Sequence, residues 1–244
     1  IVAIGAYDHD NNKGRTRIWK YRTVTEAEWQ SSDIIATVGQ TGGGDNNTTG
    51  GNRGEVYSPT TKYWIQLGSD IDGGNAGDKS GISVSLSADG TIVAIGAHRA
   101  DVDSSNSTSN EGRTRIYQYS SNGWSQLGQD LVGDADDYSS RSVSLSADGT
   151  IVAIGAYNHD VGDDPSSNEG RTRIYQYSSN NWVPIDNGGI VGDAGDSSGY
   201  SVSLSADGTI VAIGAYFHDV DSSNSTSNEG RTRIYQYSSN AWTK

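Results

Sequence analysis

The stretch Tyr200–Ala215, YSVSLSADGTIVAIGA, decides the fold of this chain. It contains two short strand patterns, Ser201–Ser205 and Thr209–Ala215, rich in β-branched and apolar residues. The turn signal Ala206-Asp207-Gly208 joins them. The stretch therefore predicts a tight antiparallel hairpin.

The same hairpin pattern occurs twice more, as SVSLSADGTIVAIGA at 83–97 and at 142–156. The interval from Leu86 to Leu145 is 59 residues, and the interval from Leu145 to Leu204 is again 59. A long period built of short strands and glycine-rich turns is typical of repeat architectures, and of β-propellers above all. The chain is therefore a set of copies of one unit.

Each full unit has four candidate strands. Strand A is SVSLS, strand B is TIVAIGA, strand C is GRTRIYQY and strand D surrounds a tryptophan. The sequence predicts an all-β fold, a β-propeller of four-stranded antiparallel blades forming a single domain over 1–244; a β-sandwich is the alternative. The D-strand tryptophan recurs at Trp29, Trp64, Trp124, Trp182 and Trp242. These predict five units, the first two irregular, at approximately 1–29, 30–68, 69–127, 128–185 and 186–244.

Composition limits the classes of partner. The 244 residues include 33% hydrophobic residues and six tryptophans, enough for a packed core rather than disorder. A net charge of −13 repels phosphate backbones, so we expect no nucleic-acid partner and regard cations as natural ligands. No apolar run is long enough to span a bilayer, so we expect no direct membrane insertion. Because the chain opens inside a repeat, we expect it to be part of something longer.

The repeat resembles the FG-GAP repeat of integrin α-type propellers. The resemblance rests on Gly199-Tyr200-Ser201-Val202-Ser203-Leu204, on Ile213-Gly214-Ala215-Tyr216, and on the GRTRIYQY strand that follows. It implies a propeller that is part of a ring or a variant of one, and an extracellular protein. Calcium-binding repeats of that family carry an Asp-rich loop between the FG and GAP strands, whereas this chain has a tight Ser-Ala-Asp-Gly turn there. That calcium site therefore does not carry over.

Alternation of strand direction predicts that the long loops share one face. The B–C and D–A loops are long and acidic, and they fall opposite the short A–B and C–D turns. Calcium prefers six to eight oxygen ligands, with carboxylates at alternating positions, so these loops are candidate calcium sites or, alternatively, solvated polar turns. The candidate ligands are Asp101, Asp103, Asp160, Asp163, Asp164, Asp219 and Asp221.

Histidines and arginines recur at fixed places in the units. His9, His98, His159 and His218 follow strand B, and we expect each to bond a nearby carboxylate rather than zinc. The Arg-Thr-Arg of strand C predicts ion pairs with the acidic loops or stacking on tyrosine, with binding of a carboxylate ligand as the alternative. Candidate N-glycosylation sites in Asn-x-Ser/Thr sequons are Asn46, Asn47, Asn106 and Asn224.

The repetition of every candidate side chain guides the functional hypotheses. A catalytic site is one asymmetric constellation, so identical copies predict a non-enzymatic protein. We expect an extracellular or cell-surface repeat protein, acting in adhesion or in a surface assembly, that binds a protein or glycan partner through the long-loop face and is able to self-assemble. Two alternatives are an accessory propeller of a secreted hydrolase and a lectin-like module using Tyr157, Tyr216 and Phe217.

Overall fold

The structure is a computed structural model and describes residues 1–23, 34–35, 62–102, 109–121, 123–161, 167–220 and 228–244. These residues form four antiparallel sheets and one helical turn, α1 (His9–Asn12). The first sheet holds β1 (Val2–Ala6), β2 (Arg15–Thr23), β3 (Ile34–Ile35), β4 (Lys62–Gln66) and β5 (Ile71–Asp72). The second holds β6 (Ser80–Leu86), β7 (Ile92–Ala97), β8 (Arg113–Ser120), β9 (Gly123–Gln126) and β10 (Leu131–Val132).

The third and fourth sheets repeat the pattern of the second. The third holds β11 (Ser139–Leu145), β12 (Ile151–Ala156), β13 (Arg171–Ser178), β14 (Asn181–Pro184) and β15 (Ile190–Val191). The fourth holds β16 (Ser198–Leu204), β17 (Ile210–Ala215), β18 (Arg231–Ser238) and β19 (Ala241–Thr243). Strands A to D of each predicted unit are neighbours in sequence order, so the predicted fold of four-stranded antiparallel blades is confirmed.

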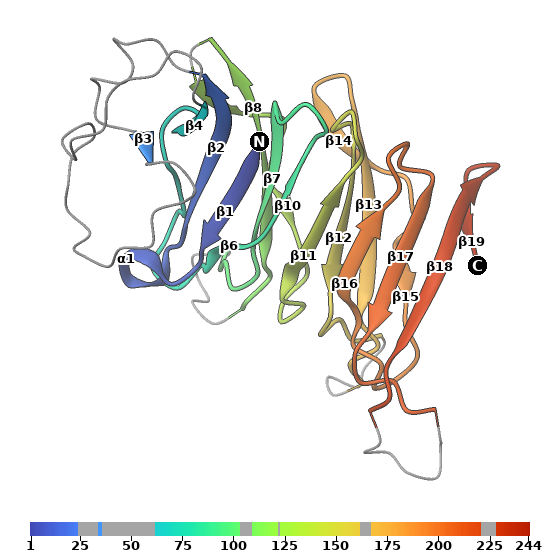
Figure 1. Cartoon of the computed structure of the whole chain (residues 1–244). Helices are drawn as coiled ribbons and strands as arrows, with labels where there is room; N and C mark the ends of the chain where they lie inside the picture. The colour runs from blue at the N-terminus through green and yellow to red at the C-terminus, as the bar shows by residue number, and fades with distance from the viewer. Residues whose placement is uncertain (24–33, 36–61, 103–108, 122, 162–166, 221–227) are drawn as a thin grey trace.

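The blades stand in a row, with the first and last sheets at opposite ends (Figure 1). Successive A strands pack on one another, β6 against β11 and β11 against β16, while β1 packs on β6. Strand B needs glycine where the next blade approaches. A Cβ on Gly155 would lie 1.9 Å from the carbonyl oxygen of Gly199 in β16. The small residues of TIVAIGA therefore allow the close approach of successive blades.

Hydrophobic side chains fill each space between blades. Between the second and third sheets, Ile116, Val152 and Ile154 are almost fully buried. The D-strand tryptophans connect blades by hydrogen bonds as well as by packing, since the Trp182 indole N–H donates to the Leu127 carbonyl at 2.9 Å. Burial of apolar area is the main source of stability here, so each blade depends on its neighbours.

Residues of the two irregular units pair within one sheet, and the expected division of the chain into five units stays a prediction. Strand β4 pairs with the second half of β2, with Trp64 opposite Tyr21, as Trp124 lies opposite Tyr119 in the next sheet. Residues of the expected units 1–29 and 30–68 thus share one sheet, and Trp64 takes the D-strand position. The segment around Trp29 lies outside the described residues. Edge pairing explains the difference, because β2 needs a partner on its free side whichever unit supplies it.

The described parts of the B–C and D–A loops of the last three sheets reach one end of the strands, as the alternation of strand direction predicted. The B–C connections after β7, β12 and β17 lie at the lower edge in Figure 1, together with α1. The D–A connections return to the same edge, where β6, β11 and β16 begin. We call this edge the loop face. It gathers the side chains that the sequence singled out.

Candidate functional site

Reciprocal carboxylate bonds close the B–C loops at their base. In the third sheet, Asp160 Oδ1 accepts the backbone N–H of Asn168 at 2.6 Å, and Glu169 Oε2 accepts that of Val161 at 3.0 Å. Asp101 and Asp219 accept the corresponding N–H groups of Asn110 and Asn228 at 2.8 and 2.6 Å. The described aspartates of the predicted calcium set therefore have a structural role as Asx-type closures.

The other predicted ligands and the sequons are not placed. Asp103, Asp163, Asp164 and Asp221 lie outside the described residues, as do the sequon residues Asn46, Asn47, Asn106 and Asn224. Calcium binding by the B–C loops and glycosylation stay predictions.

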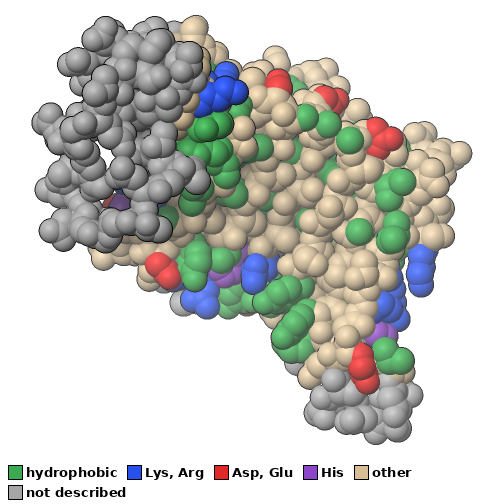
Figure 2. Space-filling view, viewed as in Figure 1, with side chains coloured by type: hydrophobic (Ala, Val, Ile, Leu, Met, Phe, Trp, Pro, Cys, Tyr) green, Lys and Arg blue, Asp and Glu red, His purple; other side chains and the backbone are tan. Residues whose placement is uncertain are grey.

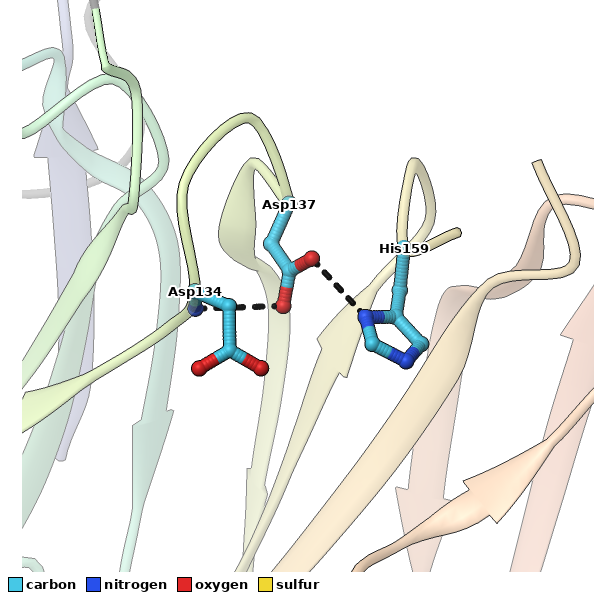
Figure 3. Close-up of side chains that lie close together, drawn as sticks. All are labelled: Asp134, Asp137 and His159. Atoms are coloured by element: carbon cyan, nitrogen blue, oxygen red, sulfur yellow. Dashed lines mark hydrogen bonds and ion pairs between the residues drawn. The ribbon is translucent and has the colours of Figure 1, made fainter. Parts of the chain in front are cut away.

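A second cluster lies beside each of two B–C loops. Asp137 precedes β11 and is 3% exposed; its Oδ1 bonds His159 Nδ1 at 2.9 Å, and its Oδ2 accepts the backbone N–H of Asp134 at 3.2 Å (Figure 3). Arg171, at the start of β13, bonds Asp137 at 2.9 Å and Asp134 at 2.5 Å. One buried carboxylate thus joins the D–A loop, the B–C loop and strand C.

The fourth sheet repeats this cluster, and the second sheet has a reduced version. Asp196 bonds His218 Nδ1 at 2.7 Å and Arg231 at 2.8 Å. In the second sheet Asp78 bonds Arg113 at 2.8 Å, but Ala100 stands at the position of the histidine. The arginine–aspartate pair is therefore common to these three blades, and the histidine is an addition in two of them.

The arginine decides what this cluster can do. Asp134, Asp137 and His159 each offer a ligand atom close enough together for a metal ion. Arg171 already lies between the two carboxylates, however, and its positive charge opposes a cation there. Burial raises the pKa of Asp134, and the Arg171 bond and charge outweigh this, so the pKa is lowered overall. The cluster is an ion-pair network. The predicted arginine–aspartate pairs are confirmed, and so is the predicted carboxylate partner for His159 and His218. For His98 the expectation is wrong, because its Nδ1 is buried without a hydrogen-bond partner among the described residues.

The most distinctive feature of the loop face is a row of rings that crosses the blades. Ring centroids lie 5.8 Å apart between Tyr138 and Tyr157, 5.6 Å between Tyr157 and Tyr200, and 5.0 Å between Tyr200 and Tyr216. His98 lies 6.2 Å from Tyr138 at one end. At the other end Phe217 packs 4.7 Å from Tyr216. We call these six residues the aromatic row.

The repeat explains the position of the row. His98, Tyr157 and Tyr216 each follow the Ala that ends strand B, whereas Tyr138 and Tyr200 stand at or near the start of strand A. These places meet because strand B ends where strand A begins. The Asp137–His159 bond braces the row, since Asp137 adjoins Tyr138 and His159 follows Tyr157 by two residues.

The row contains the three residues of the lectin-like alternative and three more. Tyr157, Tyr216 and Phe217 lie in it, with Tyr216 57% and Phe217 43% exposed. Sequence reasoning did not assign Tyr138 or Tyr200 to a site. The signal that could have found them is a tyrosine at the strand A start, facing the ring that ends strand B.

Cationic side chains pack on rings in and near the row. The Arg141 guanidinium lies over the Tyr200 ring, 4.6 Å from its centroid, and Lys79 lies 5.5 Å from the Tyr7 ring. Burial, and to a smaller extent the positive charges of Arg99, Arg141 and Lys79, lower the pKa of His98 to about 4. Figure 2 shows hydrophobic, cationic and histidine side chains side by side along this lower edge.

Comparison with known proteins adds little to this geometry. No protein-family model and no curated protein match the chain. Among solved structures, the periplasmic gluconolactonase of Pseudomonas aeruginosa is similar with a TM-score of 0.42 and 14% identity. The match covers 72% of this chain and 46% of that one. The chain thus spans under half of that neighbour's length.

That neighbour corrects one expectation. That neighbour is an enzyme, which contradicts our prediction that the chain is non-enzymatic. Repetition of side chains does not by itself exclude catalysis, because one copy placed in an asymmetric surrounding is enough for a site. A likeness at this level transfers no substrate and no residue role. Among the described helices, none is long and apolar enough to cross a membrane.

Proposed function

We propose that this chain is a repeat-built binding module of an extracellular or cell-surface protein, and that it binds glycans along the aromatic row of the loop face. The observation that carries the proposal is the row itself, a continuous series of rings crossing three blades. Sugar rings present apolar C–H faces that pack on aromatic rings, and tyrosine hydroxyls form hydrogen bonds with the sugar hydroxyls.

Exposure and rigidity both favour binding. Tyr216 and Phe217 are 57% and 43% exposed and Tyr157 is half-buried, so part of each of these rings is accessible to a ligand. The buried Asp137 and Asp196 hold the adjoining loops through their histidines, so the rings are ordered before a ligand arrives. Preorganised rings lose little entropy on binding.

A repeated row also suits a repeated ligand. Equivalent rings on successive blades contact successive units of a polymer, and several weak contacts add up to useful avidity. Adhesion or a place in a surface assembly is the role we propose for such a module.

The test replaces an exposed ring. We expect Tyr216→Leu to weaken binding to a responsive polysaccharide by roughly tenfold, the loss of one ring contact of about 1.4 kcal/mol. Tyr21→Leu is the matched control, because Tyr21 is also exposed but lies on β2 away from the row. Binding is measured by affinity electrophoresis against a panel of neutral and charged polysaccharides. Failure of the wild-type chain to bind any of them would refute the proposal.

A further inference from the structure

Two arginines lie beside the aromatic row in a chain of strongly negative charge. Arg99 directly follows His98 in the chain, and the Arg141 guanidinium lies over the Tyr200 ring, 4.6 Å from its centroid. The positive charges of Lys79, Arg99 and Arg141 all lower the pKa of His98. The whole chain carries a formal charge of −13. A cationic patch is against the overall trend of this surface.

Two of the three cations lack a carboxylate partner. Lys79 pairs with Asp8, as many surface lysines pair. Within the described part of the chain, no carboxylate forms an ion pair with Arg99 or Arg141, whereas strand C arginines such as Arg113 and Arg171 are each held by an aspartate. Arg99 is exposed and Arg141 half-buried over Tyr200. Arg141 donates one hydrogen bond to the Tyr200 hydroxyl at 3.1 Å, and its remaining donors and those of Arg99 are available for an incoming acceptor.

We infer that the stretch of the row from His98 to Tyr200 is a subsite for the anionic groups of an acidic polysaccharide, with Arg99 and Arg141 binding carboxylate or sulfate groups while Tyr138 and Tyr157 pack on the sugar rings. This inference rests on the proposed glycan binding and names its substrate class. Guanidinium groups bind carboxylate and sulfate oxygens through paired donors. His98 is neutral near pH 7 because of its lowered pKa, so it serves as a polar ring rather than as a third charge.

Charge favours this ligand over two others. A neutral polysaccharide leaves both guanidiniums without a counter-charge, and a nucleic acid brings long runs of phosphate against the acidic remainder of the surface. A polysaccharide with one anionic group per sugar places a charge beside the arginines and brings fewer charges against the acidic remainder of the surface. The ordered rings then select for sugars among polyanions.

The test compares three polymers on the whole chain. Polygalacturonate offers carboxylates, heparin offers sulfates with carboxylates, and dextran is neutral. We expect at least one polyanion to retard the wild-type chain. We expect the affinity for that polyanion to be tenfold or more weaker in the Arg99→Gln, Arg141→Gln double variant. Lys20→Gln is the control; it also removes surface positive charge, but on β2 away from the row. Melting temperatures show whether each variant is folded. If the double variant does not fold, the Arg99→Gln single variant replaces it in the binding comparison.

Each outcome decides something. Loss of polygalacturonate binding in the variant assigns a carboxylate ligand, and loss of heparin binding alone assigns a sulfate ligand. Binding of dextran as tight as the polyanions, or unchanged polyanion binding by the folded variant, would overturn this inference and leave the proposed glycan binding in place. Binding to none of a broad panel would overturn both. Affinity for a polyanion should also fall steeply with added salt, and affinity for dextran should not.

Discussion

Replacing Asp137 by alanine tests the ion-pair network at the base of the aromatic row. The Asp137 and Arg171 side chains are 4% and 8% exposed, and the pair is 2.9 Å long. Removal of the carboxylate leaves a buried guanidinium, and loss of one partner of a buried pair costs about 3–5 kcal/mol. Arg171 retains Asp134, whose side chain is 60% exposed, so we expect the lower end, about 3 kcal/mol.

The assay is urea unfolding of matched variants. Asp134→Ala removes a largely exposed partner of the same arginine, for which we expect a loss of about 0–1 kcal/mol. Asp78→Ala is the counterpart in the blade without the histidine, because Asp78 and Arg113 form an equally buried pair. We expect Asp137→Ala and Asp78→Ala to lower the free energy of unfolding by similar amounts, and both by much more than Asp134→Ala. The m-values should be unchanged. Equal losses for Asp137→Ala and Asp134→Ala would refute the reasoning.

Four further predictions follow from the packing, titration and loops. Gly155→Ala should destabilise by roughly 1–3 kcal/mol because its Cβ meets the Gly199 backbone, whereas Gly214→Ala, where the nearest atom is the Ser201 hydroxyl, should cost less; thermal melts of both check this. His98 should titrate at about 4 by NMR. Since its folded pKa lies below the ordinary value, its contribution to stability is complete above pH 6.5 and falls on acidification; a midpoint near 6.5 would contradict the account. The Asp207 carboxyl, bonded first by the Ser205 hydroxyl and then by Thr209, should titrate at about 2, and a midpoint near its ordinary value would contradict the turn geometry. If the B–C loops bind calcium, an ion at 100 times its Kd should stabilise by about 2.7 kcal/mol, with no effect of magnesium; superimposable melts in calcium and chelator would leave the Asp and Glu bonds alone closing these loops.

The sequence predicted the regular blades well because their information is local and repeated. The pattern from Ser201 to Ala215 specifies a hairpin by its β-branched residues and its Asp207-Gly208 turn, and three copies place it three times. Strand C follows with its own alternation. The first sheet was not predictable in the same way, since β4 pairs with β2 across a long intervening segment, and no local signal reports such a pairing.

The candidate site also has a part that the sequence predicts and a part that only the fold shows. That the long loops share one face followed from strand direction alone. The Asp137–His159 bond joins residues 22 positions apart in two different loops, and its length and burial come only from the fold. Likewise Tyr138 and Tyr200 are unremarkable in the sequence, and they become part of a row only because consecutive A strands pack side by side.

Chemical-shift mapping of a bound polysaccharide tests the central claim most directly. Amide spectra of the isotope-labelled chain are recorded with increasing polygalacturonate, heparin or dextran, whichever retards the wild-type chain. The account predicts shifts concentrated at the aromatic row, above all at Tyr157, Tyr200 and Tyr216, with the Ser-Ala-Asp-Gly turns at the opposite face unchanged. Shifts centred on those turns, or spectra unaffected by each of the polymers, would contradict it.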